Sequence, residues 1–145
     1  MRDEDGGDTS VLISNRQSIP VDGEGLAALA RETLMGEHVG PCELSLSFVD
    51  EEEMRELHRR YAGEEGPTDV LSFPLGEMHE GVRLLGDVVI APSVAARNNP
   101  ADAAAELRLL TVHGVLHVLG HDHEDVDARA RMWELQERYS GVRVP

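Results

Sequence analysis

The sequence predicts a single α+β domain, in which a small mixed sheet of about four strands packs with about five helices. Three observations lead to this prediction. The chain has 145 residues, the size of one compact domain. Its composition, 41% hydrophobic and 28% charged, is that of an ordinary globular protein. Segments with a two-residue period alternate with segments of helical period. We expect a flexible acidic segment at 1–9 and one folded domain at 10–145.

The first half of the chain predicts two strands and two helices in alternation. A short apolar run at 10–14 is compatible with a strand, and Asp22 then offers the start of a helix that Gly36 ends. Residues 43–48 alternate strictly between apolar and polar side chains, which is the pattern of a half-buried strand. Asp50 offers the start of the second helix. The apolar stripe of this helix consists of Met54, Leu57 and Tyr61, and Gly63 breaks it.

The second half predicts two strands followed by three helices. Residues 68–73 and 87–91 are apolar or β-branched enough for strands, and the segment between them is polar and contains glycine. A brief helix follows at 93–99. Residues 103–119 are apolar nearly all round, which predicts a central buried helix ended by a glycine. The last helix spans about 125–139. We expect its two aromatic residues in the core, namely Trp133 and Tyr139. The order of the strands stays open.

Composition excludes several classes of function. Cys42 is the only cysteine, so internal disulfides and sites with several thiolates are absent. All 13 basic residues are arginines, which excludes the lysine of a Walker phosphate loop and Schiff-base chemistry. Residues 23–28 match the dinucleotide-binding motif G-x-G-x-x-A, but no predicted strand directly precedes them. We therefore expect no nucleotide cofactor. No apolar run approaches the roughly 20 residues of a membrane span. We therefore expect a cytoplasmic protein with no membrane partner.

Histidines gather in one short segment, where four of the seven lie between positions 113 and 123. On a helix, His113 and His117 project from the same face and reach one point in space. A left-handed turn at Gly120 lets His123 approach the same point. Three imidazole ligands on one Zn²⁺ leave a fourth position open, as in catalytic zinc sites, so hydrolysis is the expected chemistry. Asp122 is a candidate to bond a ligand histidine or the reacting water.

One other hydrolytic function stays open on the spacing alone. It is a metzincin-like metallopeptidase, because the glycine and the three histidines match the metzincin motif. Gly114, however, stands where that motif has the glutamate that acts as general base, so the peptidase would lack its usual base. His121 is expected to make a local contact rather than to serve as a fourth ligand.

The segment from His113 to His123 resembles the signature of the bacterial YbeY endoribonucleases, the rRNA maturation factors. The resemblance extends to residues 15–17, 66–74 and 85–90, and thus covers nearly the whole chain. It implies an α+β fold, one zinc ion bound by the three histidines, and cleavage of single-stranded RNA. It further implies maturation of the 16S rRNA 3′ end in the small subunit, ribosome quality control, and ribosome-associated protein partners. Residues 10–145 would then form one metallo-endoribonuclease domain. The alternative is a binding module for ribosome assembly in which the zinc is purely structural.

One position departs from the resembled family. Many members have an arginine, thought to contact substrate phosphate, where this chain has Ala62. Arg60 is therefore a candidate catalytic residue and Arg59 a candidate for substrate binding, because a guanidinium is suited to the charge of a phosphodiester. The competing interpretation is an ion-paired helix face, since glutamate and arginine recur four residues apart. These pairs are Glu51–Arg55 and Glu56–Arg60.

The net charge of −15, with 28 acidic and 13 basic residues, opposes RNA binding. RNA capture then requires a local arginine-lined cleft or delivery by ribosome-associated proteins. Arg97 is the candidate for such a cleft, and Ser72 is a further candidate for substrate binding. The nucleophile is either water or the ribose 2′-hydroxyl. The product ends distinguish these routes, because attack by water leaves a 5′-phosphate and internal attack leaves a 2′,3′-cyclic phosphate.

Overall fold

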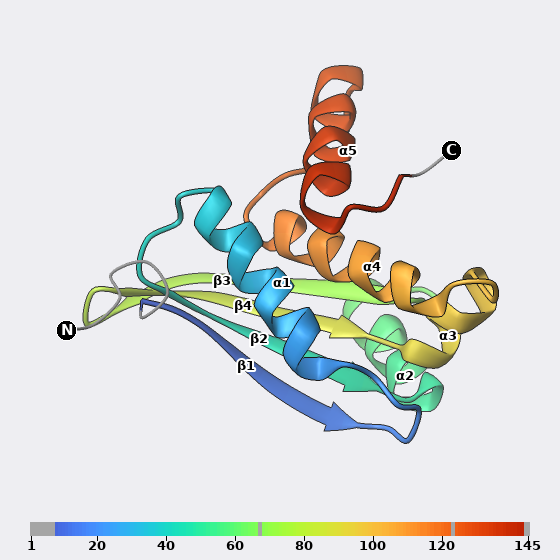
Figure 1. Ribbon diagram of the computed structural model, residues 1–145. Coiled ribbons are helices and arrows are strands. Elements are labelled where there is room, and N and C mark those ends of the chain that lie inside the picture. The colour runs from blue at the N-terminus through green and yellow to red at the C-terminus, as the bar shows by residue number, and fades with distance from the viewer. Residues whose placement is uncertain (1–7, 67, 123, 144–145) are drawn as a thin grey trace.

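The computed structural model describes residues 8–66, 68–122 and 124–143 (Figure 1). These residues form one four-stranded mixed sheet and five helices, which confirms the predicted fold class. The strands are β1 (Thr9–Arg16), β2 (Cys42–Val49), β3 (Val70–His79) and β4 (Val82–Ile90). The helices are α1 (Gly23–Gly36), α2 (Glu51–Ala62), α3 (Pro92–Asn98), α4 (Ala103–Val118) and α5 (Val126–Ser140). None of these helices is both long and apolar enough to span a bilayer.

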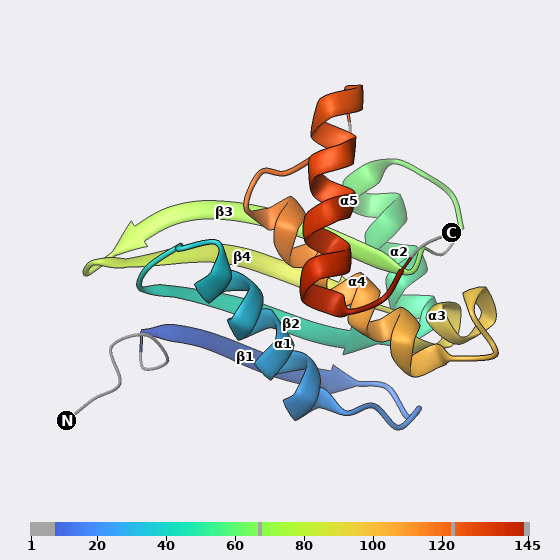
Figure 2. The same cartoon turned by 45° about the horizontal axis from the view of Figure 1, so that its top comes forward.

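The strands are arranged in the order β1-β2-β4-β3, so β1 and β3 form the two edges of the sheet (Figure 2). β1, β2 and β4 run parallel, whereas β3 runs antiparallel to β4. Helix α1 makes the crossover from β1 to β2. The edge strand β3 matters for function because its residues near Ser72 lie against α4.

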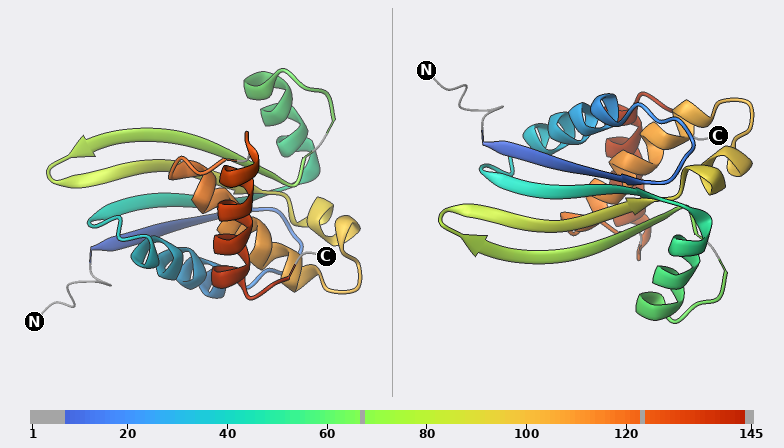
Figure 3. Two further views of the ribbon diagram at one scale, coloured as in Figure 1. Left: turned by 90° about the horizontal axis from the view of Figure 1, so that it is seen from above. Right: turned by 90° about the horizontal axis from the view of Figure 1, so that it is seen from below.

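The helices cover the two faces of the sheet unequally. Helices α1 and α4 lie on one face, where they bury the largest apolar cluster, and α5 packs on α4 and α1. Helix α2 packs on the other face near the ends of β2 and β4. The view from below in Figure 3 shows the strands in front of α1 and α4, with most of this second face uncovered by helices. Successive side chains along β3 or along β4 point to opposite faces of the sheet and therefore face different helices.

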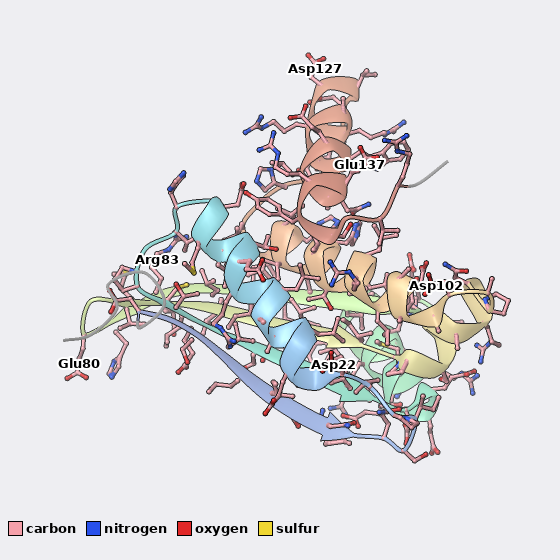
Figure 4. The ribbon with its side chains drawn as sticks, in the orientation of Figure 1. Asp22, Glu80, Arg83, Asp102, Asp127 and Glu137 are labelled. Atoms are coloured by element: carbon pink, nitrogen blue, oxygen red, sulfur yellow. The ribbon has the colours of Figure 1, made fainter. Side chains whose placement is uncertain are left out.

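Aspartates begin four of the helices, because each carboxylate accepts a hydrogen bond from a backbone N–H three residues further on. These aspartates are Asp22, Asp50, Asp102 and Asp125. Figure 4 shows Asp22 and Asp102 at the starts of α1 and α4. The helix starts predicted at Asp22 and Asp50 are thus confirmed.

Helix α4 approaches the sheet closely at Gly114. A Cβ atom at this position would lie 2.4 Å from Val88 Cγ1 and 3.2 Å from Val88 Cγ2, so glycine permits the contact. The Ser72 hydroxyl of β3 donates a hydrogen bond of 3.0 Å to the Gly114 carbonyl oxygen. These two contacts, one with β4 and one with β3, fix the distance and the rotation of α4 relative to the sheet.

Helix α4 ends in the left-handed turn that the sequence predicts at Gly120, whose φ is +100°. The Gly120 N–H donates to the His117 carbonyl and the His121 N–H to the Leu116 carbonyl, both at 3.0 Å. This pair of bonds is a Schellman motif, which satisfies carbonyl groups at the helix end and reverses the chain. The turn therefore directs residues after Gly120 back along α4.

A carboxylate at the end of α1 holds this turn. Glu37 Oε2 accepts a 2.7 Å hydrogen bond from the Tyr139 hydroxyl of α5, and Glu37 Oε1 lies 3.0 Å from His121 Nε2. The Glu37 side chain is only 14% exposed. Burial raises the pKa of Glu37, but the hydrogen bonds from Tyr139 and His121 outweigh burial and leave it below 4.5. The local contact predicted for His121 is thus confirmed.

The structure differs from the expected fold in two places. The strands predicted at 68–73 and 87–91 are longer than expected, because β3 and β4 continue through the polar segment to a two-residue turn at Glu80 and Gly81, both with positive φ. The side chains of this polar segment are largely exposed and lack an apolar period, so the pattern gave no strand signal. In α5, Tyr139 packs on the apolar cluster as expected, but Trp133 is 53% exposed. Trp133 is therefore not a core residue.

We predict that Gly114→Ala destabilises the protein by about 1–3 kcal/mol, because the added methyl group overlaps Val88 and α4 must shift. Denaturant unfolding measures the loss. Gly23→Ala is the matched control, since a Cβ there meets its neighbours only at 3.7 Å or more. Adding Val88→Ala to Gly114→Ala should recover part of the loss in a double-mutant cycle. Equal stability of Gly114→Ala and Gly23→Ala would disprove the close contact.

Glu37→Gln is expected to lower the free energy of unfolding by about 1–2 kcal/mol at pH 7. Because the pKa of Glu37 is lower in the folded protein than its ordinary value of 4.5, ionisation stabilises the fold above that pH. This contribution is lost as the pH falls through 4.5 towards the folded-state pKa. The difference between wild type and Glu37→Gln should therefore shrink on acidification, as measured by denaturant unfolding at several pH values. The exposed Glu32→Gln on α1 is the control. A difference that does not change with pH contradicts the prediction.

Candidate functional site

Two of the three predicted metal ligands lie together on α4. The His113 and His117 ring centroids are 4.5 Å apart, and the ring planes are inclined by 64°. Both residues are half-buried, on a helix whose other side packs into the apolar core. The predicted convergence of these two imidazoles on one face is thus present in the structure.

The two histidines flank the part of α4 that touches the edge strand. Gly114, which follows His113, is held by the Ser72 hydroxyl on β3. Helix α5 packs on α4 on the side of Val112 and Leu116. The histidine pair therefore lies between β3 and α5, and the rotation of α4 against the sheet determines where it points.

The donor chemistry of this pair fits a zinc ion. A neutral imidazole offers one nitrogen lone pair, and zinc accepts such nitrogens at the separation that one helix turn provides. Within the described ranges, no three His, Cys, Asp or Glu side chains are grouped closely enough to hold a metal ion. The third predicted ligand, His123, lies outside these ranges, just after the turn at Gly120. The assignment of His123 stays a prediction.

Helix α5 supplies a contact that the sequence interpretation missed. Gln136 Oε1 lies 2.7 Å from His113 Nδ1, and Gln136 is only 6% exposed. The signal was present, because Gln136 is a polar residue within the apolar stripe of the last helix. This stripe consists of Met132, Leu135 and Tyr139. A buried amide at such a position needs a polar contact, and His113 provides it.

Asp122 makes a local bond in the turn before His123. Its Oδ1 accepts the Glu124 N–H at 3.2 Å. The Nδ1 atom of His113 lies 2.7 Å from Gln136 Oε1. A role for Asp122 towards the metal or the reacting water stays a prediction.

The predicted arginine candidates lie away from the histidines and are ion-paired. Arg59 and Arg60 are on α2, which packs on the other face of the sheet from α4. Both pair with Glu56, at 2.7 Å and 3.6 Å. Arg97 on α3 pairs with Glu51 in the first turn of α2. The alternative prediction of an ion-paired helix face is confirmed, since the pairs Glu51–Arg55 and Glu56–Arg60 both form.

Comparison with known proteins places the chain among relatives of similar sequence and fold. The family model described as Endoribonuclease YbeY matches residues 12–141. The chain is similar to a solution structure of TM1509 from Thermotoga maritima, with a TM-score of 0.58 and 28% sequence identity. This similarity covers 90% of the present chain and 86% of the other.

Curated relatives carry the same description. Endoribonuclease YbeY of Thermobifida fusca is 46% identical over 88% of this chain and 89% of its own length. The protein of that name from Beutenbergia cavernae is 45% identical, over 89% of this chain and 93% of its own. The Mycobacterium tuberculosis protein is 39% identical over 89% and 80% of the two chains. From this extent of similarity, and from the match of the family model to most of its length, the chain belongs to the YbeY endoribonuclease family.

Proposed function

We propose that this protein is a zinc-dependent endoribonuclease that hydrolyses phosphodiester bonds in single-stranded RNA. The observation that carries the proposal is the half-buried pair His113 and His117 on one side of α4, in a chain of the YbeY family. Its relatives are named endoribonucleases, and the similarity extends over most of each chain. We further propose that its substrate is small-subunit ribosomal RNA, in maturation of the 16S rRNA 3′ end and in ribosome quality control in the cytoplasm.

The zinc site in this proposal is made of His113, His117 and His123. A zinc ion with three protein ligands lowers the pKa of a bound water to about 7 and offsets negative charge on a phosphoryl oxygen. The chain's own contribution is to orient the ligands. Helix α4 holds two imidazoles on one face, Gln136 bonds the first of them, and the turn at Gly120 reverses the chain before the third.

The surroundings of the histidines suit a large substrate. Both side chains are half-buried, between the edge strand β3 and α5, so a nucleic acid strand can approach them from solvent. Ser72 bonds the carbonyl of Gly114, the residue next to His113, and remains a candidate for substrate binding. Asp122 remains a candidate for proton transfer at the same site.

The candidate arginines can contribute to RNA binding only if they exchange their present contacts with glutamate for contacts with phosphate. Arg59 and Arg97 each pair with a glutamate, so contact with RNA requires that phosphate replaces a carboxylate. The same holds for Arg60 as a candidate catalytic residue. In a chain with a net charge of −15, such exchange yields little affinity. We therefore propose that ribosome-associated proteins deliver the RNA.

The close packing of α4 disfavours the peptidase alternative. A peptidase with the metzincin motif needs a glutamate at the position of Gly114. Even a Cβ atom there would lie 2.4 Å from Val88 Cγ1. The helix rotation that presents the histidines therefore excludes that carboxylate. The remaining alternative is a structural zinc in a ribosome-assembly module. It differs from the endoribonuclease in that removal of a zinc-binding histidine would unfold the protein.

His117→Ala is predicted to abolish RNA cleavage while the protein remains folded, because the half-buried His117 side chain belongs to the site rather than to the core. Cleavage of a single-stranded and a duplex RNA is assayed beside thermal melting. The protein is purified without added metal, and its metal content is measured by elemental analysis. Chelation should have the same effect as the substitution, and the duplex should resist cleavage.

The matched control is His79→Ala, a histidine whose side chain is 72% exposed on the β3–β4 hairpin and which should be dispensable. An unfolded His117→Ala protein would support the structural-zinc alternative. Peptide cleavage that is lost on chelation would instead revive the peptidase.

RNA binding in isolation is expected to be weak and strongly dependent on salt. Each paired arginine must exchange its glutamate for a phosphate, and the overall charge repels the strand. Binding of a short single strand, measured between about 50 mM and 200 mM salt, gives the slope of affinity against salt. Arg97→Gln should reduce this slope by about 1, the value for the loss of one phosphate contact. The control Arg138→Gln on α5 should leave the slope unchanged. Tight binding that is insensitive to salt would refute the delivery proposal.

A further inference from the structure

Gln136 differs from three other buried polar side chains on helices. Thr33, Thr111 and Ser140 donate their hydroxyl hydrogen to a carbonyl four residues earlier in their own helix. Gln136 instead reaches from α5 to a ring nitrogen on α4, at 2.7 Å. Burying an amide costs free energy unless it is hydrogen-bonded, so this contact has a specific role between two elements.

The chemistry of the contact determines which nitrogen of His113 carries a proton. The amide oxygen of Gln136 can only accept a hydrogen bond, so Nδ1 of His113 must donate it. A neutral imidazole has a single N–H, and its lone pair is then on Nε2. The bond also restrains rotation of the ring about its side-chain torsion. One contact thus sets both the tautomer and the orientation of the imidazole.

We propose that Gln136 is a positioning residue that holds His113 in the Nδ1–H tautomer and so presents Nε2 to the metal ion. This inference rests on the proposed metal site. Histidines that bind metals commonly donate their second N–H to a carboxylate or a carbonyl, which fixes the ring. Here a neutral amide does so, and it orients the ligand without adding negative charge to an acidic chain.

The direct test is nitrogen NMR of the histidine rings in the full-length, metal-free protein, at a pH where His113 is neutral. Wild type should show the proton of His113 on Nδ1. Gln136→Met keeps an unbranched side chain of similar length but has no acceptor, so His113 should shift towards a mixture of tautomers. Gln136→Glu keeps an acceptor and should preserve the Nδ1–H form.

Zinc affinity gives a second readout, by competition with a chromogenic chelator. Gln136→Met should bind zinc about 10–100-fold more weakly than wild type, and Gln136→Glu should bind at least as tightly as wild type. The matched control is Thr33→Val, which removes a buried hydrogen bond on α1 and should change neither tautomer nor affinity. Far-UV circular dichroism and melting confirm that each variant folds.

Two results would overturn the proposal. One is a wild-type His113 with its proton on Nε2. The other is a Gln136→Met protein whose zinc affinity falls no further than that of Thr33→Val. Failure of zinc binding in wild type would count against the proposed function instead, and the tautomer measurement would still decide the role of Gln136. If Gln136→Met does not fold, the tautomers of wild type and Gln136→Glu decide the matter.

Discussion

The contact of Gly114 with Val88 determines where the histidines of α4 lie. Because Gly114 has no side chain, the backbone of α4 lies directly against the Val88 side chain of β4, and the helix sits close to the sheet in one rotation. Ser72 reinforces that rotation from the edge strand by bonding the Gly114 carbonyl. The residues on either side of the contact, His113 and His117, are then carried out of the core to the space between β3 and α5. A side chain at the glycine would move both imidazoles together.

Other elements complete this arrangement from the opposite side. Helix α5 packs on α4 through apolar residues and places Gln136 behind His113. The same helix supplies Tyr139, which with Glu37 and His121 anchors the turn after α4. One helix thus supports both His113 and the turn after Gly120.

Much of the fold was predictable because local signals agreed with the tertiary structure. The strict alternation at 43–48, the caps at Asp22 and Asp50, and the glycine at 120 each describe a single element. The extended β3–β4 hairpin was not predictable, since the residues of β3 beyond Phe73 are exposed and carry no apolar period. The strand order was equally open, because strand pairing depends on distant segments.

The candidate site was predictable only in part for the same reason. Spacing along a helix places His113 and His117 on one face, which requires no knowledge of other elements. The contact between His113 and Gln136 joins positions 23 residues apart and depends on how α5 crosses α4. The exposure of Trp133 depends on the same crossing angle. The position of Arg59 and Arg60 beside Ala62 suggested them as candidates, but the sequence could not show that α2 packs on the other face of the sheet.

We propose that imidazoles gathered at the end of α4 form a zinc site whose fourth position is open to a non-protein ligand. X-ray absorption at the zinc edge of the metal-loaded protein tests it most directly. The predicted spectrum has three imidazole nitrogens at about 2.0–2.1 Å and one further light atom that does not come from the protein. A sulfur ligand, a fourth protein ligand or fewer than three imidazoles would contradict the account.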